Sequence, residues 1–157
     1  MPKIDIEAVP LAKGSLYPAP YDEPCRERQR QRLGNAVGLD QFGVNLLTLP
    51  PGAWSAQRHW HAAEDEFVYI LEGEVVLVDD GGEQVLRAGD CAGFKAGVAN
   101  GHHLVNRSDR DARLLEVGTR SADGADPVDY PDIDMIVPLG SDDYHHRDGT
   151  PYPVKPR

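Results

Sequence analysis

Short apolar runs, separated by residues that favour turns, fill the middle of this chain. The runs are rich in Val, Leu and aromatic residues and cover 44–49, 66–71, 74–78, 83–86 and 114–117. Breaks such as Glu72-Gly73 and the segment 79–82 suit hairpins, because Gly and Asp tolerate the left-handed backbone of tight turns. This pattern predicts an all-β, antiparallel fold. Closure into a sandwich or barrel is favoured over an open sheet because it removes exposed edges.

The two ends of the chain lack this pattern. Residues 1–40 are first Pro-rich and then Arg-rich, and we interpret them as an N-terminal arm that lies on the barrel or on a partner subunit. Residues 41–118 would form the β-barrel, and 119–157 a C-terminal tail packed on it. A length of 157 residues fits one such domain with extended arms. The tail contains a short apolar run, 133–137, that we expect to dock on the barrel.

The charge balance argues against a nucleic-acid partner. The formal net charge is −10, whereas binding to phosphate backbones requires a surplus of Lys and Arg. The local exception is Arg26, Arg28, Arg30 and Arg32, which alternate with Glu27, Gln29 and Gln31. In an extended segment with its arginines on one side they could bind an anion. The preferred interpretation is a solvated arm whose arginines pair with carboxylates.

Cysteine content and hydropathy bear on disulfides, membrane association and cellular location. Two distant cysteines, Cys25 and Cys91, suggest neither a disulfide framework nor a thiolate zinc site, so we predict free thiols, with Cys91 a small buried packing residue. The sequence shows neither a signal-peptide core nor an apolar run long enough to span a bilayer. We therefore predict no membrane partner and a cytoplasmic location.

Three histidines and an acid form the main candidate site. His59 and His61 lie two residues apart, so on a strand both imidazoles would project from one face. Glu66 opens the next apolar run and would face the same cavity if the chain turns between them. His102 opens a later segment in which Leu104 and Asn106 share its face. Such ligands suit Zn, Fe, Ni, Mn or Cu better than calcium, and the alternative is that these are surface histidines on unrelated strands.

These residues also resemble the two sequence motifs of the cupin superfamily. Gly52, His59, His61, Glu66 and Gly73 are similar to the first motif, and Gly89-Asp90, Gly97 and His102 to Asn106 are similar to the second. The resemblance covers about residues 42–118. It departs from the family pattern at Lys95, where proline is usual, and at Asn100-Gly101, which look inserted.

The resemblance implies a fold and a ligand set. The fold is a double-stranded β-helix, or jelly-roll barrel, and the ligands to a divalent metal are His59, His61, Glu66 and His102. The distance to Gly73 selects Glu66 over its acidic neighbours, and the distance to Asn106 selects His102 over His103, which would then face outward. Zinc is the preferred metal, with Fe, Mn or Ni as alternatives.

The function expected from this site is catalytic. We predict an isomerase- or lyase-like enzyme for a small oxygen-rich metabolite that chelates the metal, resembling the mannose-6-phosphate isomerase group of small cupins. Gln57 and Asn106, on the faces of the ligands, are predicted to bind substrate. Lys95 and Tyr69 are candidate acid or base groups, although a solvated lysine and a packing tyrosine are the simpler interpretations. The alternatives are a non-catalytic binding module and an iron-dependent dioxygenase.

Two features outside the barrel complete the predictions. We predict a homodimer in which the arm containing Ile4 and Ile6 adds a strand to a neighbouring barrel, since cupins of this size are commonly dimers. His145 and His146 could form a second site, but a solvated pair in the tail is preferred.

Overall fold

The computed structural model describes residues 3–121 and 125–155. Within them the strands are β1 (Leu11–Lys13), β2 (Gln29–Arg32), β3 (Phe42–Leu49), β4 (Trp60–His61), β5 (Glu66–Glu72), β6 (Glu74–Asp79), β7 (Gly82–Arg87), β8 (Cys91–Phe94), β9 (His103–Val105), β10 (Ala112–Thr119), β11 (Val128–Tyr130) and β12 (Met135–Val137). The helical elements are short: α1 (Leu33–Ala36) and two 3-10 turns, η1 (Ile6–Ala8) and η2 (Glu23–Cys25).

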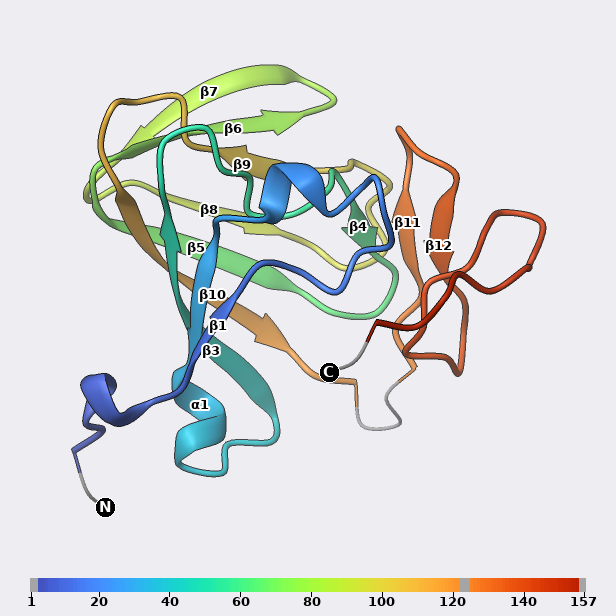
Figure 1. Cartoon of the computed structure of the whole chain (residues 1–157), viewed down its shortest axis with the longest axis horizontal. Helices are drawn as coiled ribbons and strands as arrows, with labels where there is room; N and C mark the ends of the chain where they lie inside the picture. Colours follow the sequence, from blue (N-terminus) through green and yellow to red (C-terminus); the bar gives the residue numbers. More distant parts are fainter. Residues whose placement is uncertain (1–2, 122–124, 156–157) are drawn as a thin grey trace.

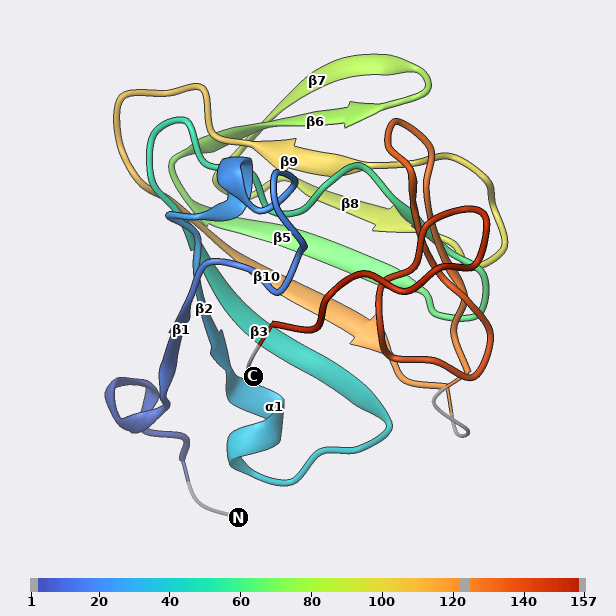
Figure 2. The ribbon, with the colours of Figure 1, turned by 45° about the vertical axis from the view of Figure 1, so that its right-hand side comes forward.

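The strands form three antiparallel sheets. The largest has the order β1-β2-β3-β10-β5-β8, the second is β7-β6-β9, and the third is β12-β11-β4. Figure 1 shows β6, β7 and β9 lying across one side of the large sheet, and Figure 2 shows β11 and β12 at the end of the barrel. The predicted all-β jelly roll is confirmed, and it is built from separate sheets rather than from one closed ring.

Alternating burial along β5 shows how the sheet faces its core. Val68 and Ile70 are buried, whereas Phe67 and Tyr69 are exposed. Glu66 shares the inward face because side chains two apart project the same way. The core on this face contains residues from both main sheets, namely Leu47, Leu49, Ala53, Val68, Ile70, Val75, Leu77, Leu86, Leu104, Ala112 and Leu114. Tyr69 therefore points away from the site, as the simpler interpretation expected.

The N-terminal arm extends the protein's own sheet. β2 pairs with β3 and β1 pairs with β2. Ile4 packs on a small cluster of Val9, Leu33 and Leu46, and Ile6 is 42% exposed. The strands of this arm thus add to the same chain, which differs from the expected addition to a neighbouring barrel. The ladder between β2 and β3 fixes the arm there, because β3 offers a free edge beside β10.

The C-terminal tail docks through its own strands. β11 pairs with both β12 and β4, and Met135 is fully buried in a cluster with Tyr17, Cys25 and Tyr130. The tail therefore meets the arm and the barrel in one apolar cluster. Its contact with β4 matters most, because β4 carries His61.

The structure also bears on three smaller expectations, which concern the cysteines, the two histidines of the tail and membrane spans. Cys91 is exposed and Cys25 is the buried cysteine, because Cys91 lies on the outward face of β8. His145 and His146 are half-buried rather than solvated: the Nδ1 atom of His146 lies 2.7 Å from a carboxylate oxygen of Asp134, and its ring stacks on Tyr152. Among the described residues no helix has the length and apolar character needed to cross a bilayer.

Candidate metal and ligand site

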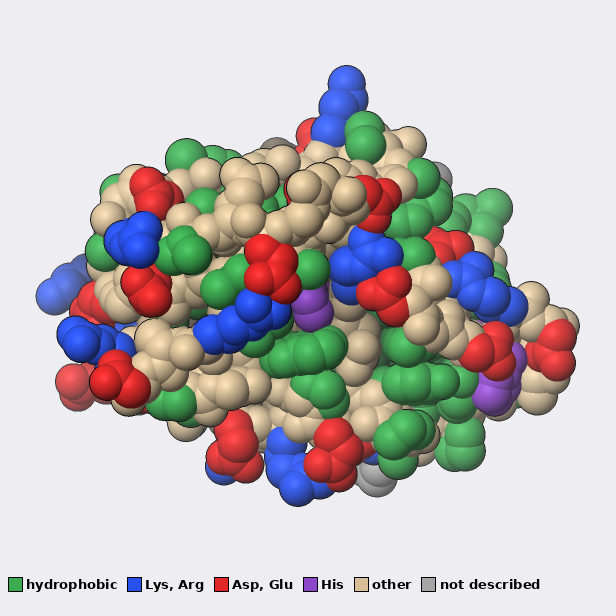
Figure 3. All heavy atoms as spheres, turned by 90° about the horizontal axis from the view of Figure 1, so that it is seen from above, with side chains coloured by type: hydrophobic (Ala, Val, Ile, Leu, Met, Phe, Trp, Pro, Cys, Tyr) green, Lys and Arg blue, Asp and Glu red, His purple; other side chains and the backbone are tan. Residues whose placement is uncertain are grey.

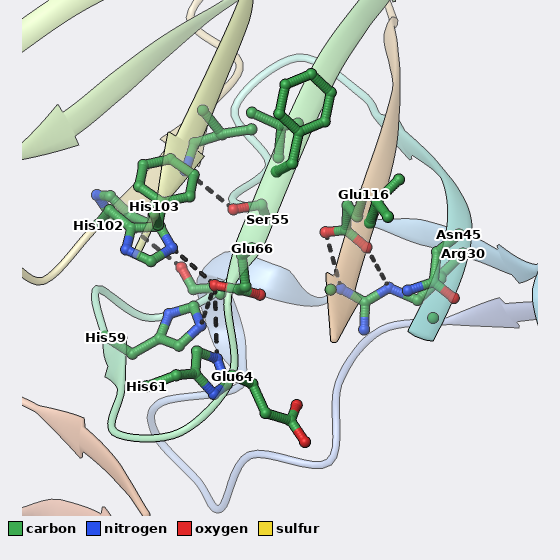
Figure 4. A pocket seen from close by; sticks show the side chains of 18 of the residues that line it. Arg30, Asn45, Ser55, His59, His61, Glu64, Glu66, His102, His103 and Glu116 are labelled. Atoms are coloured by element: carbon green, nitrogen blue, oxygen red, sulfur yellow. Dashed lines mark hydrogen bonds and ion pairs between the residues drawn. The ribbon is translucent and has the colours of Figure 1, made fainter. Parts of the chain in front are cut away.

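Three neighbouring segments bring the predicted ligands together. His59 forms an isolated antiparallel bridge with His102, which places the start of β9 beside the segment that leads into β4. His61 is the last residue of β4, and Glu66 is the first residue of β5. In Figure 4 the side chains of His59, His61 and His102 surround the carboxylate of Glu66. Residues 43 positions apart in the sequence thus meet at one point, as the motif spacing predicted.

The three imidazoles converge on one oxygen atom. The Nε2 atoms of His102, His61 and His59 lie 2.9, 3.5 and 3.8 Å from Oε2 of Glu66. The donor atoms of His59, His61 and Glu66 all lie within 4.8 Å of one another. His102 lies outside this group of three and reaches it through its contact with Glu66. Two imidazoles and a carboxylate within one small volume, with a third imidazole beside them, suit a divalent transition-metal site.

The protonation of His59 shows that the residues fit a cation. Its Nδ1 atom lies 2.8 Å from the carbonyl oxygen of Gln57, which can only accept, so Nδ1 carries the proton and Nε2 a lone pair. Burial lowers the pKa of His59 to about 3, against the opposing attraction of Glu66. The ring is therefore neutral at pH 7, and its Nε2 lone pair faces a carboxylate. A cation between them would turn this repulsion into coordination.

Glu66 is ionised in this setting. Burial opposes its charged form, but the hydrogen bond from His102 and the nearby His59 and His61 outweigh burial and hold the pKa of Glu66 well below its usual range. The carboxylate is thus available as an anionic ligand at neutral pH. Together with neutral imidazoles it would leave a bound divalent cation with one net positive charge.

A second carboxylate supports His61 from behind. Asp126 is hydrogen-bonded to Nδ1 of His61, and its other oxygen accepts the backbone N–H groups of Ala63 and Glu64 at 2.8 and 3.2 Å. Burial disfavours the charged imidazolium of His61, but Asp126 and Glu66 raise its pKa overall. Carboxylate–histidine pairs of this kind fix the ring and its tautomer in metal sites. Sequence reasoning missed Asp126 because it lies 65 residues after His61 in the tail.

His102 is held by ring stacking. Its ring lies parallel to Phe94, with 3.5 Å between the ring centroids, and Nε2 points to Glu66. The resemblance implied that the neighbouring His103 faces outward, but this residue is buried. Its Nδ1 atom is 3.1 Å from the carbonyl oxygen of Ala56, and its ring packs edge-on against Trp54. Both contacts come from the segment between β3 and β4, which covers this side of β9, so a side chain that points away from the cluster is still inside the protein.

The cluster lies between two cavities of about 400 Å³ each. Glu64, Glu66 and His61 line both, and Lys95 lines the second. The first also receives arginines from the N-terminal arm. Viewed from above, Figure 3 shows a histidine exposed near the middle of the surface, among hydrophobic and charged side chains. A small molecule can therefore approach the cluster from either cavity.

Two predicted substrate contacts lie elsewhere. Gln57 is buried and donates to the backbone carbonyl of Tyr21 at 2.7 Å. Asn106 is fully buried and donates to the carbonyls of Leu49 and Arg110 at 2.6 and 2.8 Å. Neither lines the two cavities at the histidine cluster. Both amides instead complete backbone hydrogen bonds, because buried loops leave carbonyl groups that need donors.

Comparison with known proteins gives the family. A model described as a cupin domain matches residues 45–118. A crystal structure of a sugar phosphate isomerase from a cupin superfamily, from Silicibacter pomeroyi, is 44% identical, covers 97% of each chain and has a TM-score of 0.89. The chain belongs to the cupin superfamily. The similarity to the Silicibacter protein extends through both arms, so the arms as well as the cupin barrel are shared.

Two further proteins are similar to this chain. A candidate sugar phosphate isomerase from Acidithiobacillus ferrooxidans is 28% identical, covers 93% of this chain and 91% of its own, and has a TM-score of 0.75. An oxalate-binding protein from Thermotoga maritima is 37% identical over 71 residues, which is 45% of this chain. This chain spans about half the length of that curated relative, 56%.

Proposed function

We propose that this cupin binds a divalent metal through His59, His61, Glu66 and His102 and acts as an isomerase- or lyase-like enzyme on a small oxygen-rich metabolite. The observation that carries the proposal is the convergence of three imidazole Nε2 atoms on Oε2 of Glu66, with a neutral His59 facing that carboxylate. Such a cluster is costly unless a cation joins its donors. The sugar phosphate isomerase of Silicibacter, similar over 97% of its length, supports an isomerase acting on a phosphorylated sugar.

When bound, the metal would act as a Lewis acid that polarises a substrate carbonyl or hydroxyl oxygen. The protein would supply the orientation. Tyr130 stacks on His59, Phe94 stacks on His102 and Asp126 holds His61, so each ligand ring is fixed from behind. Isomerisation also needs a group that moves a proton. Glu64 and Lys95 line the cavities beside the cluster and are the candidates for it.

Zinc is the preferred metal, with Fe, Mn or Ni as alternatives, because a set of three imidazoles and a carboxylate suits each of these ions. Stoichiometric iron, together with oxygen consumption, would instead favour the dioxygenase alternative. Bound metal without turnover of any oxygen-rich substrate would favour a non-catalytic binding module.

Elemental analysis tests the metal directly. We expect about one divalent ion per chain in protein purified without a histidine tag, and its loss in the His102→Ala variant. His146→Ala is the matched control, since this histidine also contacts a carboxylate but lies in the tail. Native protein without metal, or full retention by His102→Ala, would overturn the proposal. Conversion of a ketose phosphate to its aldose, followed by NMR, tests the reaction.

The homodimer stays part of this proposal. The outward face of β5 presents Phe67, Tyr69 and Leu71, which are 41%, 39% and 39% exposed. A continuous row of exposed apolar side chains on a sheet is typical of an interaction face. Light scattering of the full chain tests this prediction, and a monomer at micromolar concentration would contradict it.

A further inference from the structure

The arginines of the N-terminal arm line the first cavity, across from the histidine cluster. Arg28, Arg30 and Arg32 are alternate residues in and before β2, so their side chains share one face. Register places Arg30 opposite Leu47 and Arg32 opposite Asn45 on β3, and Arg120, just after β10, reaches the same cavity. In Figure 4, Arg30 and Asn45 lie on the far side of the cavity from His59 and His61.

Most of this positive charge has no carboxylate partner. Arg30 forms an ion pair with Glu116, in which Nε lies 2.9 Å from one oxygen and Nη2 donates to the other at 3.0 Å. By contrast, within the described ranges 3–121 and 125–155, Arg28, Arg32 and Arg120 form no ion pair with an acidic side chain. Three guanidinium groups in one cavity therefore keep their full charge.

Arg28 is the most informative of the three. It is only 8% exposed, and its guanidinium donates to the backbone carbonyls of Gly14, at 3.0 Å, and Ser55. The guanidinium also lies over the ring of Tyr17, 5.9 Å from its centroid. A buried cation whose neighbours are neutral groups is costly unless an anion approaches it. The arm folds so that this charge faces the cavity rather than solvent.

The remaining two arginines are placed to contact a ligand. The Arg120 guanidinium donates to the carbonyl oxygen of Leu39, at 2.8 Å, and to Oδ1 of Asn35. By contrast, the side chain of Arg32 makes no hydrogen bond to any residue that the structure describes, although its backbone pairs with Asn45. The chain carries 26 acidic against 16 basic residues, so random placement would not concentrate arginine here. Arginine is the side chain best suited to bidentate binding of phosphate or carboxylate groups.

We propose that Arg28, Arg32 and Arg120 form an oxyanion subsite that binds the phosphate or carboxylate group of the metabolite. The inference rests on the proposed function, since it places the ligand's anionic end here and its oxygen-rich end at the histidine cluster. A cavity of about 400 Å³ is in the size range of small-metabolite sites. Both anions share the chemistry that arginine recognises, so the experiment must separate them.

Calorimetric titration of metal-free, EDTA-treated protein with inorganic phosphate, and separately with acetate, tests the subsite. We expect saturable binding of at least one probe and an affinity lower by about tenfold or more in the double variant Arg32→Gln/Arg120→Gln, because each substitution removes charge-assisted hydrogen bonds. The double variant should fold, since both residues are exposed and only the two surface hydrogen bonds of Arg120 are lost; circular dichroism checks this. Arg26→Gln, in the same arm but outside the cavity, should bind like the wild type.

The outcomes separate the possible ligands and the two proposals. Binding of phosphate alone identifies a phosphate ester, and preference for acetate identifies a carboxylate-bearing metabolite. No saturable binding of either probe, or equal affinity in the double variant, would overturn the subsite. Metal analysis of each preparation before the EDTA treatment keeps the proposals apart: arginine-dependent phosphate binding by a protein that was purified without metal would refute the metal site alone, and metal in the purified protein without such binding would refute the subsite alone.

Discussion

Replacing Asp126 by asparagine should alter the proposed metal site without replacing any of the four predicted ligands. In the wild type one carboxylate oxygen of Asp126 accepts from Nδ1 of His61, and the other accepts two backbone N–H groups. Asparagine has one acceptor and one donor. If its oxygen keeps the backbone contacts, its amide faces Nδ1 and forces His61 to carry its proton on Nε2, the atom that points to Glu66.

The expected loss of metal affinity follows from this change of tautomer. Removing a carboxylate partner from a ligating histidine typically costs about 10–100-fold in metal affinity, equivalent to about 1.4–2.7 kcal/mol. The contact is largely shielded, because the side chains of His61 and Asp126 are 18% and 10% exposed. Solvent screening should therefore be weak, and we expect an effect toward the upper end of this range.

Competition between the protein and a chromophoric chelator for Zn²⁺ measures this affinity, and the visible spectrum of the Co²⁺ form reports the ligand geometry. Asp134→Asn is the matched control, because Asp134 likewise contacts Nδ1 of a histidine, His146, and accepts a backbone N–H group far from the cluster. A folded Asp126→Asn protein with zinc affinity within about threefold of the wild type, or an equal loss in Asp134→Asn, would refute this reasoning.

Three further perturbations test the fold. Gly73→Ala should lower the free energy of unfolding in urea by about 2 kcal/mol or more, since φ is +74° and a Cβ atom would lie 2.7 Å from the Asp111 carbonyl oxygen. Gly82→Ala, where no atom of the described residues, its chain neighbours aside, lies within 4 Å of such a Cβ, should lower it less, and equal losses in the two variants would contradict the argument. The hydrogen bond from Arg58 lowers the pKa of Asp132, so the contribution of Asp132 to stability is full above pH about 4 and is lost as the pH falls through the folded pKa. The stability difference between wild type and Asp132→Asn, about 1 kcal/mol because the Asp132 side chain is 54% exposed, should vanish in acid, and its persistence there would exclude this origin. A thiol reagent should modify Cys91 quickly and Cys25 only on unfolding, because Cys25 is fully buried and burial raises its pKa to about 11; two fast thiols would show that the core around Cys25 opens.

Part of the histidine cluster could be predicted from the sequence because His59, His61 and Glu66 lie close together along the chain. The spacing of His59 and His61 and the apolar run after Glu66 reflect strand alternation, which the sequence pattern displays directly. Family resemblance then selected His102. Alternation along a strand does not show which distant backbone groups a side chain meets: Asn106 follows His102 by four residues, and its amide donates to the carbonyls of Leu49 and Arg110.

By itself, the sequence determined the all-β class and the hairpins, since these depend on side-chain alternation and turn chemistry over a few residues. The four ligands stay a prediction, taken from the family resemblance, although the structure brings the four residues together. Only the tertiary structure decided the roles of the two arms. Asp126 reaches His61 because β11 pairs with β4, and the alternating arginines line a cavity because β2 pairs with β3. The alternation in the sequence was compatible with a solvated arm or an anion site. Pairing with a distant strand, which no local pattern encodes, buried Arg28 and turned Arg30 and Arg32 toward the cavity.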